Sequence, residues 1–452
     1  MWKILVALLV LAVGAAALWV NAGKAEGPAI EIGGAAVVGQ TGEVTVSVTT
    51  PGGALTGVTM KLVQGNTTLL ERTADSAALG ADGKSTTITE PIGKRALPDL
   101  KAGDATVDVT ATRSVLFGLR EATSTMSRQI QVRLTPPQLA VLSQFHYINH
   151  GGSELVVYRV TPPDSESGVR VGDREYRGFP AGGSDPALRV ALFALLWDQQ
   201  LNTPITVFAR DSIGNEGAGS FDYRVFPKQF RASTIALDDR FLARVVPPIL
   251  QNSTELKVDD PTNNLAAYLA INRDLRRMNN ETISALALET APEMLWRGAF
   301  KQLINTAVEA GFADQRTYVY NGQDVDHQVH LGFDLASTAN APVRAANRGR
   351  VVHAGWLGIY GNCVILDHGM GLQSLYAHLS SIGVSVGDIV DTEAELGRSG
   401  STGLAGGDHL HFTMLLGGNA ITPIDWWSAQ WVQDRVLRKL SEAGLPAPGG
   451  SP

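Results

Sequence analysis

Histidines are concentrated in one part of this 452-residue chain: seven of the nine lie between His327 and His411. The other two, His146 and His150, are expected on a surface loop. Clustering by itself does not separate metal ligands from histidines that pack in a core. A cluster of this density requires an explanation, and the spacing of its members supplies one.

Two short motifs in this stretch have the spacing of metal ligands. His330 precedes Asp334 by four residues, and Gly332 between them lets the backbone bend closely. His409 and His411 open an apolar run, and side chains two residues apart on a strand share one face. Zinc accepts nitrogen and oxygen ligands, and a catalytic site uses three protein ligands and a water. The motifs offer one histidine more than that, and an unliganded imidazole can handle protons.

Length and composition predict a multidomain globular protein. Domains cluster at about 100 to 150 residues, so 452 residues exceed one ordinary core. With 44% hydrophobic and 18% charged residues, long disordered tracts and multiple membrane spans are disfavoured. A net charge of −7 without any Lys/Arg run disfavours a nucleic-acid partner. The single cysteine, Cys363, lies in an apolar run and is expected to be a core residue.

The N-terminus carries an unbroken apolar run from Ile4 to Val20. Signal-peptide cores have about 7 to 15 residues and membrane-spanning helices about 17 to 25, so the length favours an anchor through residues 4–20. Trp2 and Trp19 lie at the ends of the run, where interfacial aromatics occur. A cleavable signal stays open as an alternative, because Gly23-Lys24-Ala25 is a tolerable cleavage site.

The chain between the N-terminal segment and the histidine cluster has two β-strand patterns followed by a helical pattern. Valines alternate with Thr and Ser from Val44 to Val48, as in a half-buried strand. Ile205–Asn215 resembles the final hairpin of bacterial immunoglobulin-like domains. Both β regions are interpreted as spacers. Further on, Leu265, Leu269 and Leu275 recur at helical spacing.

These patterns predict a mainly β, multidomain fold with two immunoglobulin-like β-sandwiches, a helical linker and a C-terminal domain that carries the histidine cluster. The predicted segments are 1–26, membrane anchor or signal; 27–137, β-sandwich; 138–228, immunoglobulin-like β-sandwich; 229–300, helical linker; 301–432, C-terminal domain; and 433–452, short helix and flexible tail. We further expect that the helices from Thr262 to Ala291 lie against the C-terminal domain and limit access to its groove, since their apolar stripes must be buried somewhere.

Ordered motifs between about Gly311 and Trp427 give the chain a specific resemblance to the lysostaphin/LytM family of zinc metallopeptidases. They are His330-Leu331-Gly332-Phe333-Asp334-Leu335-Ala336, Pro342-Val343-Arg344-Ala345-Ala346, Ala354-Gly355-Trp356, Tyr360-Gly361-Asn362, Asp367-His368-Gly369, Tyr376-Ala377-His378-Leu379, Gly400-Ser401-Thr402-Gly403 and His409-Leu410-His411-Phe412. The resemblance implies that residues 301–432 form a C-terminal antiparallel β zinc metallopeptidase domain. It implies that His330, Asp334 and His411 bind one Zn²⁺ per active site. It also implies that His378 and His409 are unliganded catalytic residues.

The resemblance implies an endopeptidase that hydrolyses peptide cross-links of bacterial peptidoglycan by metal-activated water, with stem peptides or cross-links as the partner. Such a protein is expected in the cell envelope, anchored by one helix in the inner membrane and facing the periplasm, or secreted if the N-terminal segment is cleaved. The sequence departs from the family at Asp408, where a proline is usual, and at Thr413, where a glutamate is common. The competing hypothesis is a non-catalytic envelope adaptor that activates another wall hydrolase. Adaptors of this family lack zinc ligands, whereas this chain keeps all five positions.

The remaining histidines of the cluster have simpler interpretations. His327 is expected to be solvated and His353 to be structural. His368, beside Asp367 at a strand end, is expected to make a turn contact.

Overall fold

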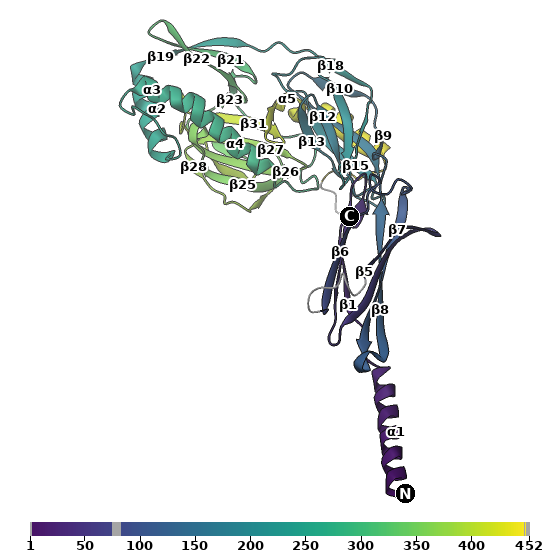
Figure 1. Cartoon of the computed structure of the whole chain (residues 1–452). Coiled ribbons are helices and arrows are strands. Elements are labelled where there is room, and N and C mark those ends of the chain that lie inside the picture. Colours follow the sequence, from purple (N-terminus) through teal and green to yellow (C-terminus); the bar gives the residue numbers. More distant parts are fainter. Residues whose placement is uncertain (1, 75–82, 447, 449–452) are drawn as a thin grey trace. The chain divides into compact units, whose positions relative to one another are not determined.

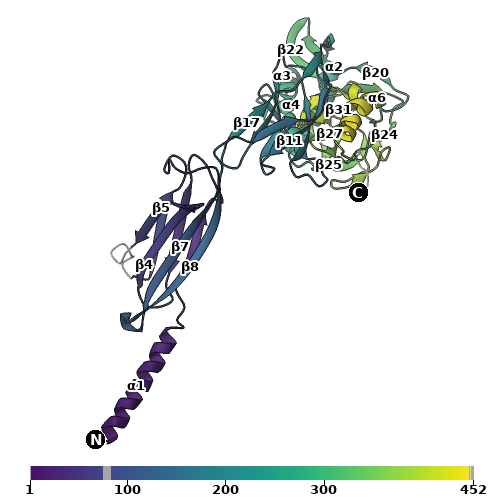
Figure 2. The same ribbon diagram turned by 90° about the vertical axis from the view of Figure 1, so that its right-hand side faces the viewer.

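The computed structural model describes residues 2–74, 83–446 and 448, and these residues are mainly β (Figure 1 and Figure 2). They form two compact units, Met1–Pro136 with Arg210–Asn215, and Pro137–Ala209 with Glu216–Pro452. The prediction of a mainly β, multidomain fold is confirmed. The immunoglobulin-like topology and the segment boundaries stay predictions, and residues 447 and 449–452 of the predicted tail lie outside the described residues.

The first unit begins with helix α1 (Trp2–Ala22), which coincides with the apolar run. Its 21 residues have a mean hydropathy of 2.5 in the most apolar window, and none of that window is buried. By length and composition α1 can cross a membrane, a test that an N-terminal signal sequence passes as well.

Two sheets follow α1 and enclose one core. One sheet has the order β1-β3-β6 and the other β2-β8-β7-β4-β5. Their strands are β1 (Ala29–Gly34), β2 (Val37–Val38), β3 (Glu43–Thr49), β4 (Leu55–Gln64), β5 (Thr67–Ala74), β6 (Ser85–Pro91), β7 (Gly103–Val115) and β8 (Arg120–Val132). The valines of β3 are buried at every second position, so the alternation seen in the sequence is the inward face of this strand.

The second unit starts with short strands that form a further pair of four-stranded sheets, with orders β14-β15-β11-β9 and β13-β12-β16-β17, and a two-stranded pair, β10-β18. The strands are β9 (Gln138–Val141), β10 (His146–Asn149), β11 (Ser153–Thr161), β12 (Glu166–Val171), β13 (Arg174–Arg177), β14 (Phe179–Pro180), β15 (Leu188–Ala194), β16 (Ile205–Arg210), β17 (Glu216–Gly219) and β18 (Tyr223–Phe226).

This β region is more than a spacer, because its core continues into the C-terminal domain. Trp426, fully buried, donates a hydrogen bond from its indole N–H to Ser153 Oγ at 3.0 Å. Glu154 and Lys439 form a buried ion pair at 2.8 Å. Burying a charged pair is favourable only with good geometry and further hydrogen bonds. The pair and the Trp426–Ser153 hydrogen bond therefore join the second β region to the C-terminal domain in one specific arrangement.

The C-terminal domain is built on a large antiparallel sheet with the order β20-β23-β31-β27-β26-β25-β29, and β32 pairs with β31. A smaller sheet, β24-β30-β28, packs beside it. The strands are β20 (Ala307–Ala310), β23 (Phe333–Ala336), β24 (Pro342–Arg344), β25 (Gly349–Trp356), β26 (Asn362–Gly369), β27 (Leu372–Leu379), β28 (Ser381–Ile382), β29 (Ile389–Val390), β30 (Glu395–Arg398), β31 (Leu410–Leu416) and β32 (Asn419–Ile421). Short helical turns follow, namely α5 (Pro423–Trp427), α6 (Ala429–Trp431), a π-helical stretch (Val432–Leu437) and α7 (Arg438–Glu442).

The predicted linker differs from the structure at its start. Residues 232–237 form strand β19 (Ala232–Leu237), which pairs in parallel with β21 (Asp314–Tyr320), and β21 pairs with β22 (Gln323–His330). Helices then follow as predicted: α2 (Asp239–Asn252), α3 (Asn264–Ala270), a π-helical turn (Ile271–Leu275) and α4 (Arg276–Ala287). Strand β19 exposes every second residue, the pattern of a half-buried strand. It falls within the predicted helical linker because helical patterns follow it directly.

Candidate metal centre

Neighbouring strands bring the predicted zinc ligands together. Asp334 on β23 and His411 on β31 are direct partners in the antiparallel register. His330 is the last residue of β22, just before the turn into β23. Strand pairing therefore unites residues that are 81 positions apart in the chain, as His330 and His411 are.

The three side chains face one another closely. Asp334 Oδ1 lies 2.9 Å from His330 Nε2 and 2.9 Å from His411 Nδ1. The two ring nitrogens are 3.0 Å apart. One possible ligand atom from each residue lies within 4.8 Å of the others, and all three side chains are almost completely buried.

Hydrogen bonds on the far side of each ring determine which nitrogen faces the centre. His330 Nδ1 lies 3.0 Å from the carbonyl oxygen of Gly311, which can only accept, so this nitrogen carries the proton. The Thr413 hydroxyl donates to the carbonyl oxygen of Leu331 and lies 2.9 Å from His411 Nε2, which must therefore donate to it. The lone pairs of His330 Nε2 and His411 Nδ1 are left facing the Asp334 carboxylate. Three converging acceptors of this kind fit a cation, and two imidazoles with one carboxylate are a zinc donor set.

The two predicted catalytic histidines face the same centre. His378 Nδ1 lies 2.8 Å from Thr402 O, and His409 Nδ1 lies 2.9 Å from Gly407 O, so both Nε2 atoms are unprotonated in the neutral rings. The rings of His378 and His409 are 4.9 Å apart between centroids. The backbone of His378 has a φ of 62°, a left-handed conformation that is strained for any residue with a Cβ. Strain of this kind persists where surrounding contacts impose it, and it occurs often at functional sites.

Burial and mutual contacts shift the ionisation of these groups. Burial opposes ionisation of Asp334, but its close contacts with His330, His409 and His411 outweigh burial and hold its pKa well below the ordinary value. Burial lowers the pKa of His411 to about 4. Burial and the charges of His409 and His411 lower the pKa of His378 well below the ordinary value. For His409, burial is outweighed by the bond and charge of Asp334, which raise its pKa. His378 is therefore a neutral imidazole near pH 7.

Gly332 is required by the close approach of its neighbours. A Cβ at this position would lie 2.6 Å from His411 Cε1 and 2.6 Å from Thr413 Oγ1. No real side chain fits at that distance, so the glycine foreseen in the sequence allows the β22–β23 turn to pass directly over the His411 ring.

Residues that the sequence reading did not single out complete the centre. Arg316 on β21 donates from Nη2 to Asp334 Oδ2 at 3.2 Å, and its side chain is 20% exposed. No motif marks this arginine, because its position depends on the pairing of β21 with β22. Asp408, a noted departure from the family, accepts from Ser399 Oγ at 2.6 Å and from Asn340 N at 3.0 Å. It ties two loops together beside His409.

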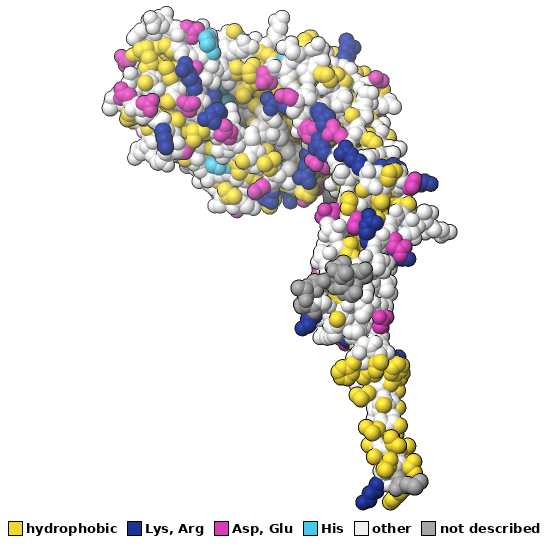
Figure 3. Space-filling model, viewed as in Figure 1, with side chains coloured by type: hydrophobic (Ala, Val, Ile, Leu, Met, Phe, Trp, Pro, Cys, Tyr) yellow, Lys and Arg dark blue, Asp and Glu magenta, His cyan; other side chains and the backbone are white. Residues whose placement is uncertain are grey.

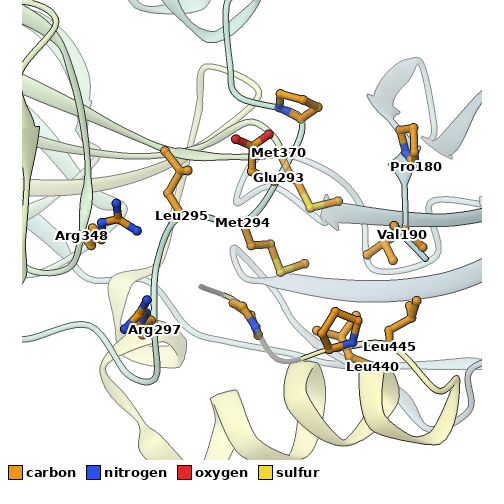
Figure 4. Close-up of a pocket in the computed structure, with 15 residues that line it drawn as sticks. Pro180, Val190, Glu293, Met294, Leu295, Arg297, Arg348, Met370, Leu440 and Leu445 are labelled. Atoms are coloured by element: carbon orange, nitrogen blue, oxygen red, sulfur yellow. The ribbon is translucent and has the colours of Figure 1, made fainter. Parts of the chain in front are cut away.

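A cavity of about 180 Å³ lies over the five candidate residues. Residues from outside the large sheet also line it, and three of them, Phe241, Tyr268 and Arg276, come from the helices before the domain. A different cavity of about 500 Å³ is shown in Figure 4, between apolar side chains such as Met294 and Leu440, with Arg297 and Arg348 at its edge. None of the five candidate residues lines that second cavity.

The other histidines serve the structure, although one prediction about them was wrong. His146 is buried, 2% exposed, and contacts Ser143 Oγ and Asp222 O at 2.9 and 3.0 Å. The loop composition around it gave no indication of this burial. His368 contacts Ser374 Oγ and Arg348 O at 2.7 and 2.8 Å, and the exposed His327 pairs with Asp324. Cys363 is fully buried, and burial raises the pKa of its thiol.

Comparisons with known proteins match the C-terminal part of the chain. The model of Peptidase family M23 matches residues 328–423. The DD-carboxypeptidase/endopeptidase Mpg of Neisseria meningitidis is 37% identical over 97 residues, 22% of this chain and 22% of Mpg. The murein hydrolase activator EnvC of Escherichia coli is 36% identical over 95 residues, 21% of this chain and 23% of EnvC. The solved catalytic domain of the antimicrobial peptidase lysostaphin from Staphylococcus simulans is 30% identical with a TM-score of 0.25, covering 29% of this chain and 98% of that domain.

The family match covers the strands that carry the candidate ligands. The family match begins two residues before His330 and extends beyond His411. The chain spans only 22% of Mpg and 23% of EnvC, so the comparisons concern this one domain. The C-terminal region of the chain is a domain of peptidase family M23.

Proposed function

We propose that the chain is a zinc-dependent endopeptidase that hydrolyses peptide cross-links of bacterial peptidoglycan. The observation that carries this proposal is the orientation of four imidazoles around one carboxylate. Each ring has one nitrogen committed to a carbonyl or hydroxyl oxygen, and each turns the other nitrogen toward the same small cavity. A core histidine has no need of such an arrangement.

His330 Nε2, His411 Nδ1 and the Asp334 carboxylate are the groups that would hold the metal. Zinc bound there would lower the pKa of a bound water and polarise a peptide carbonyl. Arg316 and the Thr413 hydroxyl hold two of these ligands from behind, which keeps the carboxylate ionised and selects the His411 tautomer.

His378 and His409 would move protons at their Nε2 atoms. Both atoms are free to accept, because the Nδ1 protons are held by Thr402 O and Gly407 O. One Nε2 takes a proton from the attacking water and a protonated imidazole returns one to the leaving amine. The hydrogen bond from His378 Nδ1 to Thr402 O keeps this ring in place.

The test of the proposal is digestion of purified peptidoglycan by the full-length protein in detergent, with products identified by mass spectrometry. New amino termini within the cross-links, abolished by a chelator and restored by zinc, are expected. An adaptor, like the murein hydrolase activator EnvC, would release no fragments with or without zinc but would accelerate a separate wall hydrolase. The complete set of five site residues favours the enzyme.

We also propose that residues 232–287, here called the covering segment, restrain the enzyme. Phe241 and Tyr268 of this segment line the active-site cavity, whose volume of about 180 Å³ is small for a peptide substrate. Ligand pockets ordinarily measure about 300 to 1,000 Å³. A stem peptide would therefore need the covering segment to move before it reaches His378 and His409.

Asp326 on β22 is a polar attachment of the helical part of this segment. Its buried carboxylate accepts from Asn272 Nδ2 and from Arg273 Nε, each at 2.8 Å. Replacing Asp326 by alanine is expected to raise the initial rate of cross-link hydrolysis about tenfold, since a hydrogen bond to a charged group contributes about 1.5 to 3 kcal/mol. Rates are measured by release of soluble fragments from labelled peptidoglycan.

The matched control is Asp324→Ala on the same strand. Asp324 pairs with His327 at 3.0 Å, and both side chains are at least half exposed, so this loss should leave the rate unchanged. Circular dichroism checks that both variants fold. Equal rates for folded Asp326→Ala and the parent protein would rule out restraint through this attachment.

A further inference from the structure

The turn between β7 and β8 exposes apolar side chains in an unfavourable backbone conformation. Leu116 and Phe117 have φ values of 51° and 58°, in the left-handed region that favours glycine. Phe117 is fully exposed and Leu119 is 70% exposed. Residues 116–119 are here called the hairpin tip. A soluble turn would carry Gly or Asn at such positions, so these bulky apolar residues need a partner to explain them.

The C-terminal end of α1 and the residues that follow it contact the base of this hairpin. Arg120, directly after the tip, donates from Nη1 to Trp19 O at 2.6 Å, and its guanidinium lies 4.8 Å from the centre of the Trp19 ring. Arg113 donates from Nε to Glu26 O at 2.7 Å. The C-terminal end of α1 and the hairpin tip therefore lie side by side.

The surface formed by these parts has the pattern of a membrane boundary. Hydrophobic side chains cover the length of α1 and continue onto the adjoining end of the first β unit (Figure 3). Trp19 is at the end of the apolar helix, where aromatic residues lie at the level of the lipid headgroups.

We propose that the hairpin tip inserts into the lipid headgroup and acyl boundary beside α1, as a second membrane contact of the first β unit. This inference rests on the expectation, from the length of its apolar run, that α1 stays in the membrane as an anchor. Exposed apolar groups beside an apolar helix favour lipid over a protein partner, because the tip continues the surface that α1 already presents. With α1 and the hairpin tip both in contact with lipid, the first β unit has one preferred orientation at the bilayer. A single helix would leave it free to rotate.

The single native cysteine makes a direct test possible. Cys363 is fully buried and burial raises the pKa of its thiol, so a thiol-reactive fluorophore should label only introduced cysteines in the folded protein. Phe117→Cys and Asn66→Cys are labelled in the full-length protein and reconstituted into phosphatidylethanolamine and phosphatidylglycerol vesicles. Asn66 is the matched control, because it is exposed in the β4–β5 turn at the opposite end of the same sheet.

The label at position 117 is expected to shift its emission to the blue, to be quenched by a lipid-soluble quencher and to resist aqueous iodide. The label at position 66 should show none of these effects. A third label, at Leu11→Cys in α1, reports whether the helix itself is in the bilayer. Lipid contact at 11 without contact at 117 overturns the proposal and leaves the anchor intact. Absence of lipid contact at both positions overturns the anchor and the proposal together.

Discussion

His411→Ala is expected to lose bound zinc and peptide hydrolysis together. His411 Nδ1 is one of three converging ligand atoms, and two remaining ligands hold zinc far less tightly. The same paired loss is expected for His330→Ala and Asp334→Ala. Zinc content is measured by atomic emission after dialysis, and hydrolysis by cleavage of purified cross-linked peptidoglycan.

His378→Ala and His409→Ala are expected to keep zinc while turnover falls by about 100-fold or more, the usual scale for a general acid or base. Neither residue belongs to the three-residue ligand cluster, although His409 Nε2 lies 3.4 Å from Asp334 Oδ1. This difference between the two groups separates a ligand from a residue that moves protons.

The control for both groups is His327→Ala. His327 lies three residues before His330, but its side chain is 70% exposed, so zinc and turnover should stay at parental levels. Circular dichroism on every variant separates loss of function from loss of fold. If His409→Ala loses zinc while His411→Ala keeps it, the two roles are exchanged. Full cleavage by all five site variants would show that the enzyme proposal is wrong.

Lys439→Met is expected to lower the free energy of unfolding of the second unit by about 3 to 5 kcal/mol, because it leaves a buried charge without its partner. Lys439 Nζ donates to Glu154 Oε1 at 2.8 Å and to Leu155 O at 2.9 Å. Glu154 also accepts from the backbone N–H groups of Tyr147 and Leu155. Denaturant unfolding followed by tryptophan fluorescence reports this change, since Trp296 and Trp426 lie in the same core.

Arg277→Met is the matched control. Arg277 and Glu281 form an ion pair on α4, but both side chains are more than 60% exposed, so its loss should change stability by less than about 0.5 kcal/mol. Adding Glu154→Gln to Lys439→Met should recover part of the loss, since the uncompensated charge is removed. Equal, small effects of Lys439→Met and Arg277→Met would mean that the buried pair does not hold the second β region to the C-terminal domain.

The candidate site could be predicted because its information is local. Residues two apart on a strand share a face, and this periodicity placed His409 and His411 on one side before any fold was known. Their roles came from a resemblance, and the structure brings all five residues around one cavity. Burial of Cys363 followed in the same way from the apolar run around it.

Other features left no local trace. Strand β19 could not be recognised among its helical neighbours, because its pairing partners lie 83 positions further along the chain, as Ala232 and Gln315 do. Burial of His146 results from packing against Phe221, whose ring centre is 4.7 Å away, and the composition of a loop does not record such a contact.

Short-range periodicity thus specified the mainly β fold, the apolar N-terminal helix and the facing histidines, since each depends on residues a few positions apart. The contact of Arg316 with Asp334 and the burial of the Glu154–Lys439 pair came from the tertiary structure. Glu154 and Lys439 are 285 positions apart, and the sequence around each predicts only a charged side chain on the surface. Only the packing of a shared core removes both from water, and charges buried in this way depend on each other for stability.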